Sequence, residues 1–252
     1  MKGKSANRLV PVAISAMLAA TLSACGGGGG SGGASSTAID TTPVTTSFPV
    51  QQALTYAFTH GMQSPTLTIT GSTTNGALSY TLSGTLTYTL STATSATFEG
   101  AAALQSTETI NGTITANGTS QPLSVTGTLF LNPQYVPIGA NSSNNYCVAT
   151  GTPNYPATAS AGQSGDIVTM NCYADSTKRS LVNVEKLSYV TTAGSEANTL
   201  NFQMVTTDYG LTGTPVTSSS TTYTISAAGI PKLTRVQISG TEDGITINLD
   251  AK

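Results

Sequence analysis

The chain of 252 residues contains no tryptophan and one histidine, and only 8% of its residues are charged. A single histidine, His60, leaves little from which to build a metal-ligand cluster or a Ser/His/Asp triad. No Gly-x-Ser-x-Gly sequence surrounds any serine, and without tryptophan the aromatic platform typical of sugar-cleaving sites is missing. We therefore predict no catalytic residue, no metal site and no cofactor, and we interpret His60 as a surface residue at the end of a strand.

Positive charge is also scarce. Three of the nine Lys and Arg residues lie within the first eight positions, and none occurs between Cys25 and Lys178. The remaining six face eleven acidic residues, so the chain beyond Cys25 carries about five negative charges. Binding of nucleic acid requires a cationic footprint, and docking to anionic lipid requires clustered Lys or Arg. Both kinds of partner are excluded.

The first 25 residues have the three parts of an export signal. A cationic start is followed by a short apolar run, Leu9 to Leu22, and by Leu22-Ser23-Ala24-Cys25. The apolar run is too short for a stable membrane-spanning helix. This stretch resembles the signal peptide and lipobox of a bacterial lipoprotein precursor. The resemblance implies that residues 1–24 are removed and that Cys25 receives a diacylglycerol and a further acyl chain such as palmitate. The alternative is an ordinary secretory peptide with a chance cysteine.

The expected anchor determines the compartment. Two or three acyl chains hold a protein on a membrane almost permanently. Gly26 follows the cysteine, where Asp would signal retention in the inner membrane under the enterobacterial sorting scheme. We expect an outer-membrane protein that is attached through the lipid on Cys25 and faces the periplasm or the cell surface.

A tether follows the anchor. Residues 26–33 are glycine except for Ser31, and Ser, Thr and Pro43 dominate up to Ser47. Glycine-rich coil of this length reaches roughly 15 Å, and the stretch to Ser47 reaches roughly 25 Å. Such tracts resemble the tethers of some surface-displayed lipoproteins of Gram-negative bacteria. Residues 25–47 are thus predicted to be a flexible spacer, and residues 48–252 the folded body.

The body has the alternation of β-strands. Between Ala77 and Leu90 the even positions are Leu, Tyr or Gly and the odd ones from Ser79 to Thr89 are Ser or Thr, which indicates a half-buried strand, or two joined at Gly84. Asn117-Gly118 predicts a hairpin turn. Further strands are predicted at Leu54–Thr59, Thr66–Gly71, Thr97–Leu104, Glu108–Thr115, Leu123–Leu131, Ile167–Tyr173, Leu181–Val190, Thr199–Thr206, Thr221–Ser226, Leu233–Ile238 and Ile245–Leu249.

These segments predict an all-β fold. We expect an antiparallel meander of about 10–12 strands, forming a strongly curved sheet, a barrel or a sandwich, with no helix after the signal peptide. Gly-Thr-Leu or Gly-Thr-Ile recurs at Gly84, Gly112 and Gly127. Glycine inside a strand permits a sharp bend, or alternatively the close approach of a ligand to the backbone.

Cys147 and Cys172 are an even pair in an oxidising compartment, which predicts a disulfide. They enclose the connection at about residues 132–172, which is rich in Pro, Asn and Tyr and separates the cation-free half from the rest. We favour one body over two small domains. Within this connection Tyr135, Tyr146 and Tyr155 are candidates for a binding surface.

Three functions remain open. The first, which we favour, is a non-enzymatic binding or structural module that contacts an envelope protein or a cell-wall component. The second is a carrier of an apolar ligand or lipid in a curved sheet. The segments 229–238 and 244–249 resemble the closing hairpin of lipoprotein-carrier half-barrels, whose ligands are acyl chains beneath helical lids. The third is a hydrolase that uses two of the eleven acids.

Overall fold

The computed structural model of the protein describes residues 46–143, 145–242 and 245–252. These residues form one α-helix, α2 (Val50–His60), and a single sheet of fourteen strands. The strands are β1 (Met62–Gln63), β2 (Leu67–Asn75), β3 (Leu78–Leu90), β4 (Thr94–Phe98), β5 (Ala101–Ala116), β6 (Thr119–Leu131), β7 (Pro137–Asn141), β8 (Tyr146–Ala149), β9 (Ser164–Tyr173), β10 (Leu181–Ala193), β11 (Thr199–Tyr209), β12 (Pro215–Ser226), β13 (Pro231–Glu242) and β14 (Ile245–Ala251).

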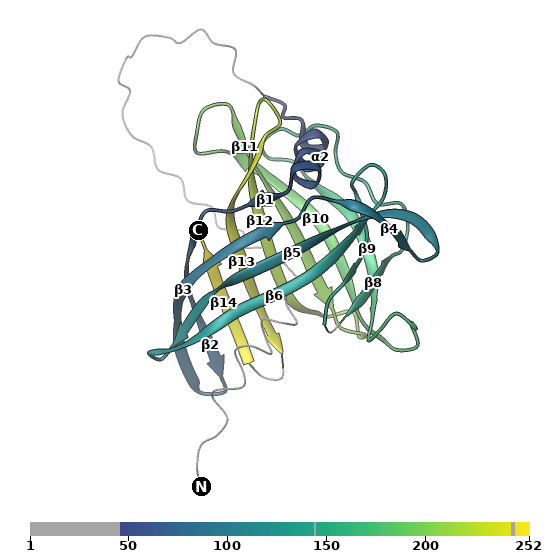
Figure 1. Ribbon diagram of the computed structural model, residues 1–252. Helices are drawn as coiled ribbons and strands as arrows, with labels where there is room; N and C mark the ends of the chain where they lie inside the picture. Colours follow the sequence, from purple (N-terminus) through teal and green to yellow (C-terminus); the bar gives the residue numbers. More distant parts are fainter. Residues whose placement is uncertain (1–45, 144, 243–244) are drawn as a thin grey trace, which may run out of the picture.

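The sheet closes into a ring. Strands β5 to β14 lie side by side in chain order, β14 pairs with β2, β2 with β3, and β3 with β5. The short strand β1 pairs with β3 beyond the end of β2, and the short strand β4 pairs with β5 beyond the end of β3. In Figure 1 the teal strands β5 and β6 cross in front of the yellow strands β13 and β14. The predicted antiparallel meander is confirmed, and it is a closed barrel rather than an open sheet or a sandwich.

Alternation along each strand fills the interior of the ring. On β3 the side chains of Leu82, Leu86, Tyr88 and Leu90 are each at most 4% exposed, whereas the Ser and Thr residues between them are exposed or half-buried. One face of an antiparallel sheet can therefore bury apolar side chains while the other presents hydroxyl groups to water. The few charges of the body are thus compatible with a hydrated outer surface.

Helix α2 contradicts two predictions, namely the strand at Leu54–Thr59 and the absence of any helix after the signal peptide. Leu54, Tyr56 and Phe58 suggested a period of two. In the structure Leu54 and Phe58 share one helix face with Val50, Ala53 and Ala57, all buried, while Tyr56 points outward and is 40% exposed. This spacing is that of an amphipathic helix, which ends before Gly61. In Figure 1 the helix lies at one end of the ring.

Other strand boundaries also differ from prediction. The predicted strand Thr97–Leu104 is two strands, because Glu99 and Gly100 adopt positive φ angles of 50° and 77° and form a turn between β4 and β5. The connection between residues 132 and 165 contributes β7 and β8, which were not predicted. The hairpin turn at Asn117-Gly118 is confirmed, with φ angles of 52° and 75°.

Gly84 allows β3 to continue as one strand. Its φ angle is 149°, and a Cβ atom placed there would lie 2.0 Å from the carbonyl oxygen of Thr113 on β5. The ring thus brings two backbones together at a point where only glycine fits. This contact is structural and involves the pairing that closes the ring.

Candidate functional site

The interior of the ring is not completely filled. A central cavity of about 90 Å³, counted as space open to the centre of a water molecule, lies beneath Leu54, Ala57 and Phe58 of α2. Its walls come from β3, β5, β6, β7 and β9 to β12 and are largely apolar. The polar side chains that line it are Glu108, Tyr155, Glu185, Thr206, Thr221 and Tyr223. A mainly apolar cavity with a few inward polar groups is the usual form of a small-molecule site.

Glu108 enters this cavity from β5. Its Oε1 atom accepts a hydrogen bond from the hydroxyl of Tyr88 on the neighbouring strand β3. Burial raises the pKa of Glu108, and the hydrogen bond from Tyr88 opposes that rise. Burial and the nearby carboxyl also raise the pKa of Tyr88 well above its usual value, so the phenol is a donor at neutral pH.

Two further phenols surround Glu108. Tyr155 and Tyr223 are 2% and 3% exposed, and the Tyr155 hydroxyl donates to Sδ of Met204 at 3.6 Å. Burial is the main cause that raises the pKa of each, and the proximity of Glu108 adds to it. These neutral hydroxyls provide polar contacts without charge inside the ring.

Glu185 is the second carboxyl of the central cavity. It is 2% exposed and lies on β10 directly opposite Asp208 of β11. Asp208 accepts hydrogen bonds from Asn183 Nδ2 at 2.8 Å and from Thr217 Oγ1 at 2.5 Å. Burial, and secondly the charge of Asp208, raise the pKa of Glu185 well above its usual value, so of the two carboxyls Glu185 is the one expected to hold a proton.

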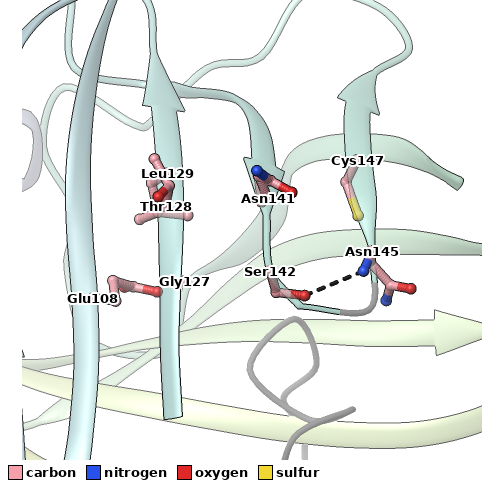
Figure 2. A pocket seen from close by; sticks show the side chains of 9 residues that line it. Glu108, Gly127, Thr128, Leu129, Asn141, Ser142, Asn145 and Cys147 are labelled. Carbon is pink, nitrogen blue, oxygen red and sulfur yellow. Dashed lines mark hydrogen bonds between the residues drawn. The ribbon is translucent and has the colours of Figure 1, made fainter. Parts of the chain in front are cut away.

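A side pocket of about 20 Å³ adjoins the central cavity and shares Glu108, Leu129 and Ala140 with it. Figure 2 shows Glu108 on one side of this pocket, and Ser142 and Asn145 on the other. The backbone N–H of Asn145 donates to Oγ of Ser142 at 3.3 Å. The side pocket has room for about one water molecule next to the carboxyl of Glu108.

The predicted disulfide is present. Cys147 on β8 and Cys172 on β9 are directly paired across the two strands, with their Cα atoms 3.9 Å apart. Both side chains are buried, and Sγ of Cys147 lies 3.3 Å from Oε1 of Glu185. The bond therefore joins two neighbouring strands of the wall beside the cavity rather than pinning a loose insertion.

The three tyrosines proposed as a binding surface do not form one. Tyr155 is buried in the interior and lines the central cavity. Tyr135 is half-buried, and its ring stacks on Phe58 of α2 at a centroid distance of 6.4 Å. Tyr146 donates to Glu99 Oε1 at 2.7 Å, and burial, followed by this hydrogen bond, raises its pKa to about 12. A shared surface of these residues is therefore excluded by the burial of Tyr155.

The other sequence candidates lie away from the cavity. His60 is exposed at the end of α2, where its ring stacks on Tyr56 at a centroid distance of 4.1 Å. Cys25, the expected lipidation site, is outside the described residues. Within the part of the chain that the structure describes, no helix is both long and apolar enough to cross a membrane.

One group of potential metal ligands exists among the described residues, formed by Cys147, Cys172 and Glu185. The two sulfur atoms are bonded to each other, so neither offers a thiolate to a metal ion. The group does not fit a metal site in this oxidation state.

The two acids of the cavity were missed by sequence reasoning. A signal was present, because Glu108 shares its strand face with Ile110 and Ile114, and Glu185 shares its face with Leu187. An acid at an inward position of an alternating strand indicates a buried carboxyl. Its partners could not be read from the sequence, because they come from other strands.

Comparisons with protein-family models, with curated proteins and with solved structures each found no match to this chain.

Proposed function

We propose that the protein is a lipid-anchored, non-enzymatic binding protein of the bacterial outer membrane, which takes a small ligand into its central cavity. The observation that carries this proposal is the central cavity itself, which lies beneath α2 and is lined by apolar side chains, a few hydroxyls and two carboxyls. The lipobox at Cys25 and the glycine tether support attachment to a membrane at some distance from the bilayer.

The size of the cavity restricts the ligand. The central cavity offers about 90 Å³ to water centres and the side pocket about 20 Å³, so the central cavity has room for several water molecules or for one small organic molecule. A whole acyl chain does not fit this volume unless α2 moves away. The proposal is therefore a binder of small molecules rather than a lipid carrier.

A second candidate function is hydrolysis, since Glu108 and Glu185 line one cavity. Hydrolysis by paired carboxyls requires one ionised group that acts as nucleophile or base and one protonated acid. Burial raises the pKa of both glutamates, which disfavours the ionised partner. We therefore prefer binding to catalysis.

The test uses the full-length protein purified from membranes in detergent. Small apolar probes such as xenon and n-butanol should bind the wild type and raise its melting temperature. Ala140→Leu fills space shared by the two pockets and should abolish binding, whereas Ala102→Leu, at an exposed position, should not. Equal binding by the wild type and Ala140→Leu, or no binding by either, would refute the proposal.

A further inference from the structure

The charge lining the central cavity is of one sign. Glu108 and Glu185 line the cavity, and none of the lining residues is Lys, Arg or His. The ion pairs of the described residues involve other acids, Glu99, Asp166 and Asp250. An anionic ligand would therefore meet two carboxyls and no compensating cation.

Glu185 forms no ion pair with any of the residues that the structure describes. Its carboxyl is almost completely buried, lies 3.3 Å from Sγ of Cys147, and is on the strand position opposite the acid Asp208. A disulfide sulfur carries no proton to donate. Glu108, by contrast, accepts from Tyr88, and Asp208 accepts from Asn183 and Thr217. A buried carboxyl that points into a cavity without donor or cation is unfavourable on its own.

The remaining wall suits a cation with an apolar body. Phe58, Tyr155 and Tyr223 contribute aromatic rings, which attract cations through their faces. Leu187 and Met170 provide apolar surface next to Glu185. Charge, aromatic rings and apolar surface thus occur together in one small space.

We propose that the ligand of the central cavity is a small organic cation, a short alkylammonium, whose ammonium group pairs with the carboxylate of Glu185. This inference rests on the proposed function and names the class of its ligand. The ammonium supplies the positive charge that the wall lacks, and the alkyl body occupies the apolar space beneath α2. A short alkyl body suits a cavity with room for several water molecules.

Binding is coupled to a proton. An alkylammonium ion pairs with Glu185 only when that carboxyl loses its proton, which leaves to solvent. The other titratable groups around Glu185 are Asp208 on β11, Glu108 on β5, Tyr155, and Tyr223 on β12. Since the phenols stay neutral, the affinity of the cavity for an alkylammonium ion should increase as pH rises and Glu185 ionises.

The experiment is calorimetric titration of the full-length protein in detergent with n-butylammonium, n-butanol and butyrate at pH 7.5. We expect butylammonium to bind at least tenfold more tightly than butanol, with release of about one proton, and butyrate not to bind. Proton release is measured by repeating the titration in buffers of different ionisation enthalpy. Glu185→Gln should reduce the preference for butylammonium over butanol to near unity, whereas the exposed Glu196→Gln should retain it.

The outcomes separate the two proposals. Equal affinity of the wild type for butylammonium and butanol would overturn the cation inference and leave the proposed cavity function intact. Binding of neither compound, together with failure of xenon to bind, would overturn both. If Glu185→Gln does not fold, the selectivity of the wild type for butylammonium over butanol and its release of a proton still decide.

Discussion

At the scale of single residues, the central cavity is lined by two acids, Glu108 and Glu185, and by no Lys, Arg or His that could pair with them. Glu185 and Glu108 lie on strand faces otherwise used for apolar packing, and burial raises the pKa of each. Buried carboxyls reduce stability at neutral pH, because the unfolded chain ionises them freely. Their presence in a cavity is more easily explained by ligand recognition than by packing.

Glu185→Gln should stabilise the protein at pH 7.5. The folded state keeps the proton of Glu185 at pH values where the unfolded chain has lost it. The stability that this protonated carboxyl allows is therefore fully present below the ordinary pKa of 4.5, and it is lost as pH rises towards the raised pKa of the folded state. Glutamine cannot ionise, and the expected gain is about 1.4 kcal/mol for each pKa unit of the rise. Urea unfolding at pH 4 and pH 7.5 measures it, and the gain should vanish at pH 4.

The control for this prediction is Glu196→Gln, at an exposed position, which should change the unfolding free energy by less than about 0.5 kcal/mol. Destabilisation by Glu185→Gln at pH 7.5 would show that the carboxylate is ionised and satisfied in the folded protein.

Gly84→Ala should destabilise the ring by roughly 2 to 4 kcal/mol, because a Cβ atom would overlap the carbonyl oxygen of Thr113 and the φ angle of 149° strains any other residue. Gly76→Ala is the matched control, since Gly76 has a φ angle of 58° but no atom within 4 Å of the added carbon. The control should cost about 1 kcal/mol. Similar losses in the two variants, measured by urea unfolding, would contradict a close backbone contact at Gly84.

At the scale of elements, local signals predicted most strands and failed where tertiary contacts decide. The alternation over 78–90 and the turn at Asn117-Gly118 are properties of adjacent residues, and both appear as predicted. The sequence of helix α2 has the apolar spacing of an amphipathic helix, but the large residues Leu54 and Tyr56 also follow the two-residue spacing of a strand. Short strands β7 and β8 lie in a segment rich in Pro, Asn and Tyr, and they depend on pairing with β6 and β9.

The disulfide between β8 and β9 should stabilise the protein by about 3 to 4 kcal/mol, because it closes a loop with a sequence separation of 25 residues in the unfolded chain. Cys147→Ala/Cys172→Ala should lose that amount in urea unfolding. A reducing agent should weaken the wild type similarly and leave the double variant unchanged. A wild type that is equally stable with and without the reducing agent would contradict this role.

At the scale of the whole molecule, the sequence indicates both the curved sheet and the anchor, but not the cavity. Strand number and alternation predict a meander, whereas closure depends on the pairing of β3 with β5, which no local pattern reveals. The cavity collects side chains from α2 and from strands distributed around the ring, so its lining residues share no sequence motif.

Anchoring is tested at Cys25. Cys25→Ser should abolish incorporation of labelled palmitate and move the protein from the membrane fraction to the soluble fraction, because the resemblance to a lipobox assigns the acyl chains to this residue. Cys147→Ala is the control and should keep the label. Continued labelling of Cys25→Ser would place the lipid elsewhere.

The pairing of β2 with β14 also affects how the protein is made. Ile69 of β2 lies opposite Ala251 of β14, so β2 completes its pairing only after the seven residues of β14 have been made. Synthesis delivers a chain from its N-terminus, so the edges of β2 and β13 that pair with β14 stay open until β14 has been made. Contacts of such long sequence separation form slowly. Open strand edges are prone to pair with other chains, so aggregation competes with folding until β14 has emerged.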